Sequence, residues 1–185
     1  GCSGSTPKPD QAGAETLIPT EIPEGFKTAV VGAGCFWCVE EFYERLDGVS
    51  EVVSGYAGGT TSDPTYKAVS RGATDHAEVV EIIYDPSVIS YRQRIDFVWT
   101  THDATRDDGV WPDFGPQYRS ILLYQNDEEK AEIEASLEAY ESETGKKIAT
   151  EIAKLDHFYP AESYHQDYAK RNPRDRYVVN ILYPK

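Results

Sequence analysis

Residues 28–46 read TAVVGAGCFWCVEEFYERL, and two cysteines stand three residues apart in this stretch. The apolar run 28–31 predicts a buried strand, and the glycines on either side of Ala33 predict the tight turn that ends it. From Cys35 to Leu46 the apolar side chains recur near helical spacing, and Asp47-Gly48 closes the pattern. The stretch therefore predicts a strand, a glycine turn and a helix that begins with a cysteine.

Strand and helix patterns alternate irregularly along the rest of the chain, with no internal repeat. Further strands are predicted at 49–56, 76–84, 118–124, 148–155 and 177–182. Further helices are predicted at 66–70, from a Ser90 cap to about 102, from an Asn126 cap to 145, and at 162–170, with a Gly/Pro/Asp-rich loop at 103–116. Because strict βαβ repetition is absent, the pattern predicts one α+β or mixed α/β domain.

The composition is that of a single folded domain. The chain has 185 residues, of which 39% are hydrophobic. Its 18 basic and 32 acidic residues give a net charge of −14, which argues against nucleic acid as a partner because phosphate binding needs clustered Lys and Arg. No stretch approaches the roughly 20 apolar residues of a membrane span. We expect the folded part to be soluble and monomeric.

Residues 1–26 are rich in Gly, Ser, Thr and Pro without apolar periodicity, which predicts a flexible arm before a domain at 27–185. Gly1-Cys2 followed by small and polar residues resembles the processing site of bacterial lipoproteins, in which the cysteine carries the lipid. The sequence thus predicts a lipid anchor on Cys2 and a place in the bacterial cell envelope or periplasm. The alternative is an ordinary cysteine beside an arbitrary boundary, with the cytoplasm as the default location.

Cys35 is the candidate reactive group. The free N–H groups and the positive dipole end of a helix favour a thiolate, and the glycines before Cys35 let a substrate approach the sulfur closely. Taken alone, this position is equally compatible with a small buried cysteine at a strand–helix junction.

Cys38 lies three residues further on, so that its side chain shares a helix face with Cys35, at about 5–6 Å between Cβ atoms. A disulfide needs about 4 Å, so a modest distortion of the first turn would form a bond that is easily reduced. A zinc site is excluded, because the domain has no second cysteine pair and the chain has only 4 histidines. The sequence predicts no metal.

The segment Gly34-Cys35-Phe36-Trp37-Cys38-Val39-Glu40 resembles the GCFW signature of the A-type peptide methionine sulfoxide reductases. Further segments resemble the same family in the same order: GYAGG at 55–59, DPTY at 63–66, HAEVV at 76–80, YDP at 84–86, QYRS at 117–120, and AE at 161–162 with HQDY at 165–168. One motif could be coincidence, whereas an ordered set from about residue 28 to 173 is highly specific.

The resemblance implies a two-layer α/β sandwich related to ferredoxin-like folds and the reduction of methionine-S-sulfoxide, free or in proteins. It implies Cys35 as the nucleophile on sulfur and Glu78 as the acid that protonates the departing oxygen. It also implies that no organic cofactor is needed, because an external thioredoxin-like protein supplies the electrons.

The resemblance assigns supporting roles to five further side chains. Tyr66 and Tyr118 would hydrogen-bond the sulfoxide oxygen, since phenol O–H groups are neutral donors. Phe36 and Trp37 would form an aromatic cup for the S-methyl group, although a core role for Phe36 stays open. Asp113 would orient polar groups at the mouth of the site.

The chain departs from the family pattern in three ways. Cys38 stands where the family often has glycine, the usual C-terminal resolving cysteine is missing, and the loop 107–115 reads DDGVWPDFG instead of the common GND-x-G form. Cys38 is therefore the candidate to replace the missing resolving cysteine. It would condense with the sulfenic acid that the reaction leaves on Cys35. The alternative is a one-cysteine enzyme in which an external thiol attacks Cys35 directly.

Two other classes of protein remain as alternatives. A thioredoxin-like dithiol oxidoreductase also places C-x-x-C at a helix start after a strand, but this reading leaves Glu78 and Tyr66 unexplained. A non-enzymatic surface lipoprotein would use Cys35 and Cys38 as a structural disulfide, and mutation of either would then cost only stability.

Overall fold

The structure, a computed structural model, describes residues 22–184. Six strands form the main sheet: β1 (Lys27–Ala33), β2 (Val49–Ala57), β3 (Ala77–Tyr84), β6 (Ser120–Tyr124), β7 (Glu151–Lys154) and β8 (Tyr159–Pro160). The α-helices are α1 (Phe36–Glu44), α2 (Tyr66–Ser70), α3 (Tyr91–Thr101), α4 (Asp127–Thr144) and α5 (Tyr168–Arg171). None of the helices in this part of the chain combines the length and apolar character of a membrane span.

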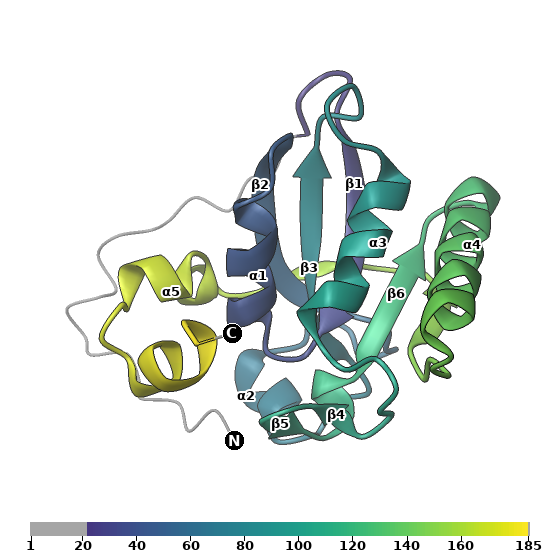
Figure 1. Ribbon diagram of the computed structural model, residues 1–185. Coiled ribbons are helices and arrows are strands. Elements are labelled where there is room, and N and C mark those ends of the chain that lie inside the picture. Colours follow the sequence, from purple (N-terminus) through teal and green to yellow (C-terminus); the bar gives the residue numbers. More distant parts are fainter. Residues whose placement is uncertain (1–21, 185) are drawn as a thin grey trace.

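The centre of the fold is ferredoxin-like. Strands β6, β1, β3 and β2 lie side by side in that order, each antiparallel to its neighbour, and α1 and α3 cover one face of this sheet (Figure 1). Strand β7 adds to the edge at β6 in parallel, and β8 adds to the opposite edge at β2. The predicted two-layer α/β sandwich in a single domain is therefore confirmed.

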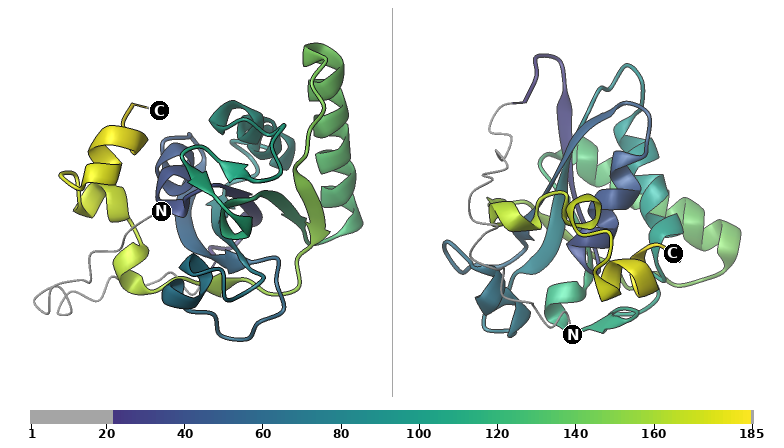
Figure 2. Two further views of the ribbon diagram at one scale, coloured as in Figure 1. Left: turned by 90° about the horizontal axis from the view of Figure 1, so that it is seen from below. Right: turned by 90° about the vertical axis from the view of Figure 1, so that its left-hand side faces the viewer.

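The sheet is apolar on both faces, which explains why β1 reads as a continuous apolar run instead of an alternating one. Ala29 and Val31 pack in the large core beneath the helices, while Val30 belongs to a smaller cluster on the other face. The chain between β7 and β8 runs across that second face from one edge of the sheet to the other, and its Leu155 and Phe158 cover the smaller cluster (Figure 2).

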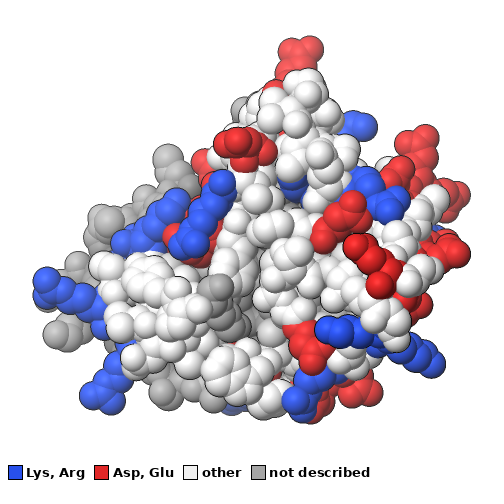
Figure 3. Space-filling model, in the orientation of Figure 1, with Lys and Arg blue, Asp and Glu red and all other residues white. Residues whose placement is uncertain are grey.

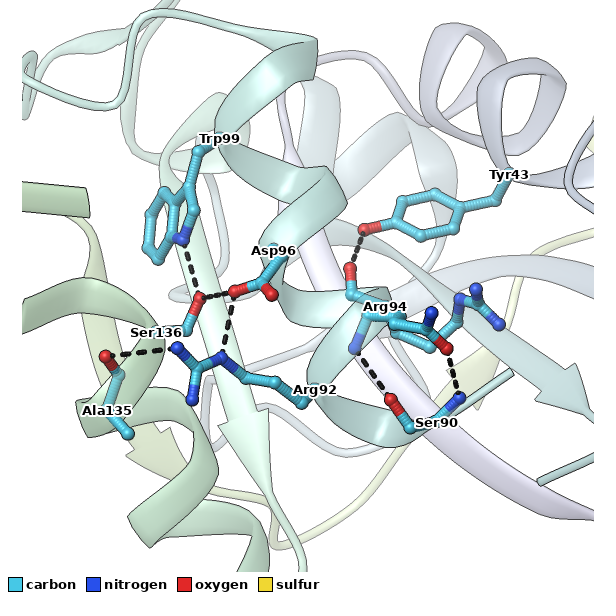
Figure 4. A network of polar contacts seen from close by, with 9 residues as sticks. Tyr43, Ser90, Arg92, Arg94, Asp96, Trp99, Ala135 and Ser136 are labelled. Carbon is cyan, nitrogen blue, oxygen red and sulfur yellow. Dashed lines mark hydrogen bonds and ion pairs between the residues drawn. The ribbon is translucent and has the colours of Figure 1, made fainter. Parts of the chain in front are cut away.

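Helices α3 and α4 are joined by a buried polar contact (Figure 4). Ser136 of α4, which is 1% exposed, accepts a hydrogen bond from the Trp99 indole at 2.9 Å and donates one to Asp96 at 2.5 Å. Arg92 donates to the same carboxylate and, at 3.4 Å, to the Ala135 carbonyl. These contacts fix the long helix α4 against the edge of the α/β layer.

Both helix starts that were predicted from capping residues are present. Ser90 and Gln93 form a reciprocal capping box at the start of α3, and Asn126 accepts a hydrogen bond from the Glu129 amide at the start of α4. The predicted helix 66–70 coincides with α2.

The predicted strand 177–182 is wrong. Residues Val178–Leu182 form a short π-helical turn in which Val178 and Leu182, four residues apart, are buried while Val179 is 45% exposed. This segment pairs with none of the described strands. The β-branched side chains therefore pack at helical spacing instead.

Two further segments differ from prediction in detail. The expected helix 162–170 is divided into a 3₁₀ turn at Ser163–His165 and α5, because Asp167 adopts a left-handed conformation with φ of 53°. The loop 103–116 contains a two-stranded hairpin of β4 (Gly109–Val110) and β5 (Asp113–Phe114), followed by a 3₁₀ turn at Pro116–Tyr118.

Ser136→Ala should destabilise the protein by about 1–3 kcal/mol, because the buried Trp99 N–H loses its acceptor. Ser142→Ala, on the exposed surface of the same helix, has the same effect on helix propensity and should change stability by less than about 0.5 kcal/mol. Urea unfolding of both variants measures the difference. Equal midpoints for the two variants would contradict the role given to Ser136.

Candidate active site

Cys35 is the N-cap residue of α1, at the end of the glycine turn that follows β1. Its side chain is 3% exposed and that of Cys38 is 1% exposed, and the two are present as thiols, not as a disulfide. Gly34 has a φ of +94°, and a Cβ there would lie 2.8 Å from the Cβ of Val110. Only glycine therefore allows the β4–β5 hairpin to approach the turn before Cys35 this closely.

Glu78 of β3 reaches the start of the same helix. Its carboxylate oxygen Oε1 accepts a hydrogen bond from the backbone N–H of Phe36 at 3.2 Å, and the side chain is 1% exposed. Phe36 follows Cys35 directly, so the structure brings the predicted nucleophile and the predicted acid together at one helix N-terminus. At this position the helix dipole favours a thiolate at Cys35.

Aromatic rings surround this helix start. Phe36 and Trp37 are both buried, and each stacks on the Tyr66 ring, with ring centroids 6.2 Å and 6.5 Å apart. The structure therefore brings Tyr66 together with the two residues of the predicted aromatic cup. In the view of Figure 3, the surface over the lower end of α1 and over the C-terminal segment carries mostly uncharged side chains.

Tyr118 is buried at the end of the 3₁₀ turn before β6. Two residues later, Ser120 pairs with Ala33 at the last position of β1. Tyr118 therefore lies at the same end of the sheet as the glycine turn that precedes Cys35.

Asp113 and Cys38 are linked by a tyrosine that sequence reasoning did not single out. The Tyr177 hydroxyl donates a short hydrogen bond to Oδ2 of Asp113, and the Cys38 thiol donates to the Tyr177 oxygen at 3.7 Å. Burial raises the pKa of Tyr177, and the nearby charges of Cys35, Cys38 and Asp113 raise it further. The phenol is therefore neutral. The chain has 13 tyrosines, and no pattern in the sequence distinguishes Tyr177 from the others.

The HQDY segment holds Trp37 in place. The indole Nε1–H donates to Nδ1 of His165 at 3.0 Å, and the Tyr168 ring stacks on the indole with centroids 3.7 Å apart at an interplanar angle of 7°. Burial lowers the pKa of His165 to about 3, so the imidazole is neutral and its proton is on Nε2. The sequence contained this segment as a motif, but it gave no role to either side chain.

Glu40 fastens that segment to the rest of the domain. Its buried carboxyl accepts a short hydrogen bond from the Ser54 hydroxyl and one of 2.5 Å from the Asp167 backbone N–H. Gln166 adds a pair of hydrogen bonds to the backbone of Ser54, each 2.9 Å long. Together these contacts tie the HQDY segment to β2 and α1, and they thereby position Tyr168 against Trp37.

A group of acidic side chains with the spacing of metal ligands lies further along α1. Carboxylate oxygens of Glu40, Glu44 and Asp167 lie within 4.8 Å of one another. Burial raises the pKa of Glu40 to about 9 and that of Glu44 to about 7, and the Lys170 ammonium lies 2.5 Å from Glu44. Protons and an ammonium group therefore offset much of the negative charge of this cluster.

Comparison with known proteins identifies the family. The family model for peptide methionine sulfoxide reductase matches residues 27–185. The peptide methionine sulfoxide reductase MsrA of Haloquadratum walsbyi is 48% identical over 159 residues, which cover 86% of this chain and 91% of that protein.

Solved structures agree with the sequence relatives. Mxr1 from Saccharomyces cerevisiae in reduced form has a TM-score of 0.78 at 38% identity, covering 83% of this chain and 89% of that chain. Mxr1 in complex with Trx2 has a TM-score of 0.58 at 29% identity, covering 83% of this chain and 91% of that chain.

At the start of its first helix, this ferredoxin-like sheet carries two thiols and a buried carboxyl, which are the groups that a thiol oxidoreductase uses. The chain belongs to the MsrA family of peptide methionine sulfoxide reductases, and its activity is the reduction of methionine sulfoxide.

Glu40→Gln should change the pH dependence of stability. Burial raises the pKa of Glu40 from its ordinary 4.5 to about 9 in the folded protein. Between these values the folded state keeps a proton that the unfolded chain releases, so the free energy of unfolding falls as pH rises, by up to about 1.4 kcal/mol per pH unit. Gln cannot ionise. Its amide oxygen can accept from the Asp167 N–H, and its amide N–H can donate to the Ser54 oxygen once that hydroxyl turns its own proton away.

The variant should therefore gain stability relative to the parent protein from about pH 5 to about pH 9. Urea unfolding across this range measures the gain, with Glu138→Gln on the exposed surface of α4 as the matched control. Parallel stability curves for Glu40→Gln and the parent protein would show that Glu40 does not carry a buried proton.

Proposed function

We propose that this protein reduces methionine-S-sulfoxide, peptide-bound or free, with Cys35 as the nucleophile and Glu78 as the acid. The single observation that supports the proposal best is the contact between Glu78 and the backbone N–H of Phe36, because it holds a buried carboxyl beside the thiol at a helix N-terminus. An uncharged side chain such as oxidised methionine suits the aromatic surroundings of Phe36 and Trp37.

In the first step, the Cys35 thiolate attacks the sulfoxide sulfur while Glu78 delivers a proton to the oxygen. The phenols of Tyr66 and Tyr118 stabilise the developing charge on that oxygen by hydrogen bonding. The oxygen ends on Cys35 as a sulfenic acid, and methionine leaves as the reduced product.

In the second step, the Cys38 thiol attacks the sulfenic acid, so that a Cys35–Cys38 disulfide forms and water leaves. Helical spacing of the two cysteines supports this step, since no long loop has to move to bring the sulfurs together. A thioredoxin-like protein then reduces the disulfide, as suggested by the relative Mxr1, which has been solved in complex with Trx2.

The thioredoxin-like dithiol oxidoreductase is the weaker reading, because the buried carboxyl of Glu78 and the phenol of Tyr66 have no part in simple disulfide exchange. Lipid attachment at Cys2 and a place in the cell envelope stay predictions, and Cys2 lies outside the described residues.

Cys35→Ser should abolish sulfoxide reduction and leave the fold intact, because the hydroxyl is a far weaker nucleophile than a thiolate. Glu78→Gln should slow the single-turnover rate by about 10²–10⁴-fold, the usual contribution of a positioned acid. Glu81→Gln, on the other face of the same strand, is the matched control and should react at the parent rate. Rapid-quench measurement of methionine release gives the three rates. Substantial turnover in Cys35→Ser would overturn the assignment of the nucleophile.

Cys38→Ser should complete one turnover and then fail to recycle with thioredoxin, because no second thiol is at hand to release the oxygen from Cys35. The Cys38→Ser variant and the parent protein both carry Cys2→Ser, so that Cys2 cannot replace Cys38 as the resolving thiol. A dimedone adduct on Cys35, found by peptide mapping, identifies the accumulated sulfenic acid. If the parent protein with intact Cys38 accumulates the same adduct, an external thiol attacks Cys35 directly and the resolving role is refuted.

A further inference from the structure

Cys38 has to lose its proton before it can attack the sulfenic acid, because the thiolate is the nucleophile in disulfide formation. The side chain is 1% exposed and sits in the first turn of α1, so solvent has little access to the sulfur. A side chain that is hydrogen-bonded to the thiol therefore offers the most direct path for this proton.

We infer that Tyr177 is a further catalytic residue of this protein, which relays the Cys38 thiol proton to Asp113 during disulfide formation. The inference rests on the proposed function of Cys38 as the resolving thiol and goes beyond it by naming the path of the proton. Tyr177 touches a reacting atom directly, at 3.7 Å from the Cys38 sulfur, whereas Asp113 acts through Tyr177.

Two hydrogen bonds form one continuous path from Cys38 to Asp113. The Cys38 thiol donates to the Tyr177 oxygen, and the Tyr177 hydroxyl donates to Oδ2 of Asp113. Asp113 is 2% exposed, so its carboxylate is an acceptor shielded from water. When the phenol oxygen takes up the Cys38 proton, the phenol passes its own proton to the Asp113 carboxylate. The phenol therefore stays neutral throughout.

Packing holds the ring of Tyr177 in the orientation that this path needs. The ring meets the Trp37 indole edge-on, with centroids 5.9 Å apart at 76°. The backbone N–H of Tyr177 donates to Asp175 at 2.8 Å, and the buried Val178 anchors the turn that follows. The tail 175–183 thus presents the Tyr177 phenol to the Cys38 thiol.

The step balances as a condensation without an external oxidant. The Cys38 sulfur gives its electron pair to the Cys35 sulfur, the S–O bond of the sulfenic acid breaks, and the oxygen leaves as water. The thiol proton passes to Tyr177 while the Tyr177 proton passes to Asp113, which afterwards returns one proton to the departing hydroxide. Cys38 is oxidised and Cys35 is reduced, both to the disulfide level.

The test is the rate and pH dependence of disulfide formation in Tyr177→Phe, a change that keeps the ring and removes the hydroxyl. Reduced protein is mixed with one equivalent of N-acetyl methionine-S-sulfoxide, and each quenched sample is analysed for methionine and for the Cys35–Cys38 disulfide. Because both products are followed in the same samples, the second step is separated from the first. Asp113→Asn is the second variant, and Tyr183→Phe, with a half-exposed ring in the same tail, is the matched control.

In Tyr177→Phe, disulfide formation at pH 7 should slow by at least about 10²-fold, the usual contribution of proton transfer by a positioned group. The residual rate should rise about tenfold per pH unit toward the ordinary thiol pKa near 8.5, because the thiol then ionises without a relay. Asp113→Asn should show the same pH dependence, and Tyr183→Phe should match the parent protein.

An unchanged pH profile in Tyr177→Phe and Asp113→Asn would overturn the relay, even if both rates were lower, since a merely structural defect slows the step equally at every pH. If the parent protein itself forms no Cys35–Cys38 disulfide, the proposed function of Cys38 fails, and the relay fails with it. The two failures are therefore distinguishable from one set of measurements.

Discussion

The hydrogen bond from the Phe36 amide to the Glu78 carboxylate joins the two halves of the site, and its geometry depends on the register of the central sheet. Val31 of β1 pairs with Val80 of β3, so Glu78 lies level with the end of β1, beside the turn that carries Cys35. Glu78 shares its face of the strand with Val80 and Ile82, which pack beneath the helices. A shift of one residue in this register would turn Glu78 to the opposite face and separate its carboxyl from Cys35.

Contacts outside the central sheet position the other side chains around Cys35 and Trp37. The hairpin β4–β5 brings Asp113 toward the thiols, while the Glu40 and Gln166 contacts bring the HQDY segment against Trp37. Each of these segments is irregular and would not keep its place by backbone pairing alone. Buried hydrogen bonds to charged or amide groups hold them, and such bonds stabilise one arrangement because a lost partner would leave a polar group unsatisfied.

Much of the fold was predictable from local patterns. The glycine turn before Cys35, the Ser90 and Asn126 caps and the apolar run of β1 each predict an element that the structure contains. The strand predicted at 177–182 was wrong because β-branched composition does not determine whether a segment lies beside another strand or packs as a helical turn. The position of Tyr177 beside Cys38 could not be predicted either, because it depends on a contact between residues 139 positions apart. The pairing of Phe36 with Glu78 spans 42 positions, and only the resemblance to a known family pointed to Glu78 beforehand.

If Cys35, Glu78 and Cys38 act as proposed, the reduced protein completes one reduction of an S-sulfoxide without any added reductant. The most direct measurement mixes the reduced protein with the separated S and R epimers of N-acetyl methionine sulfoxide and records both methionine yield and intact protein mass. We expect one equivalent of methionine from the S epimer, little from the R epimer, and a protein lighter by two hydrogens that carries the Cys35–Cys38 disulfide. Equal yields from both epimers, or a protein heavier by one oxygen and stable in that form, would contradict this expectation.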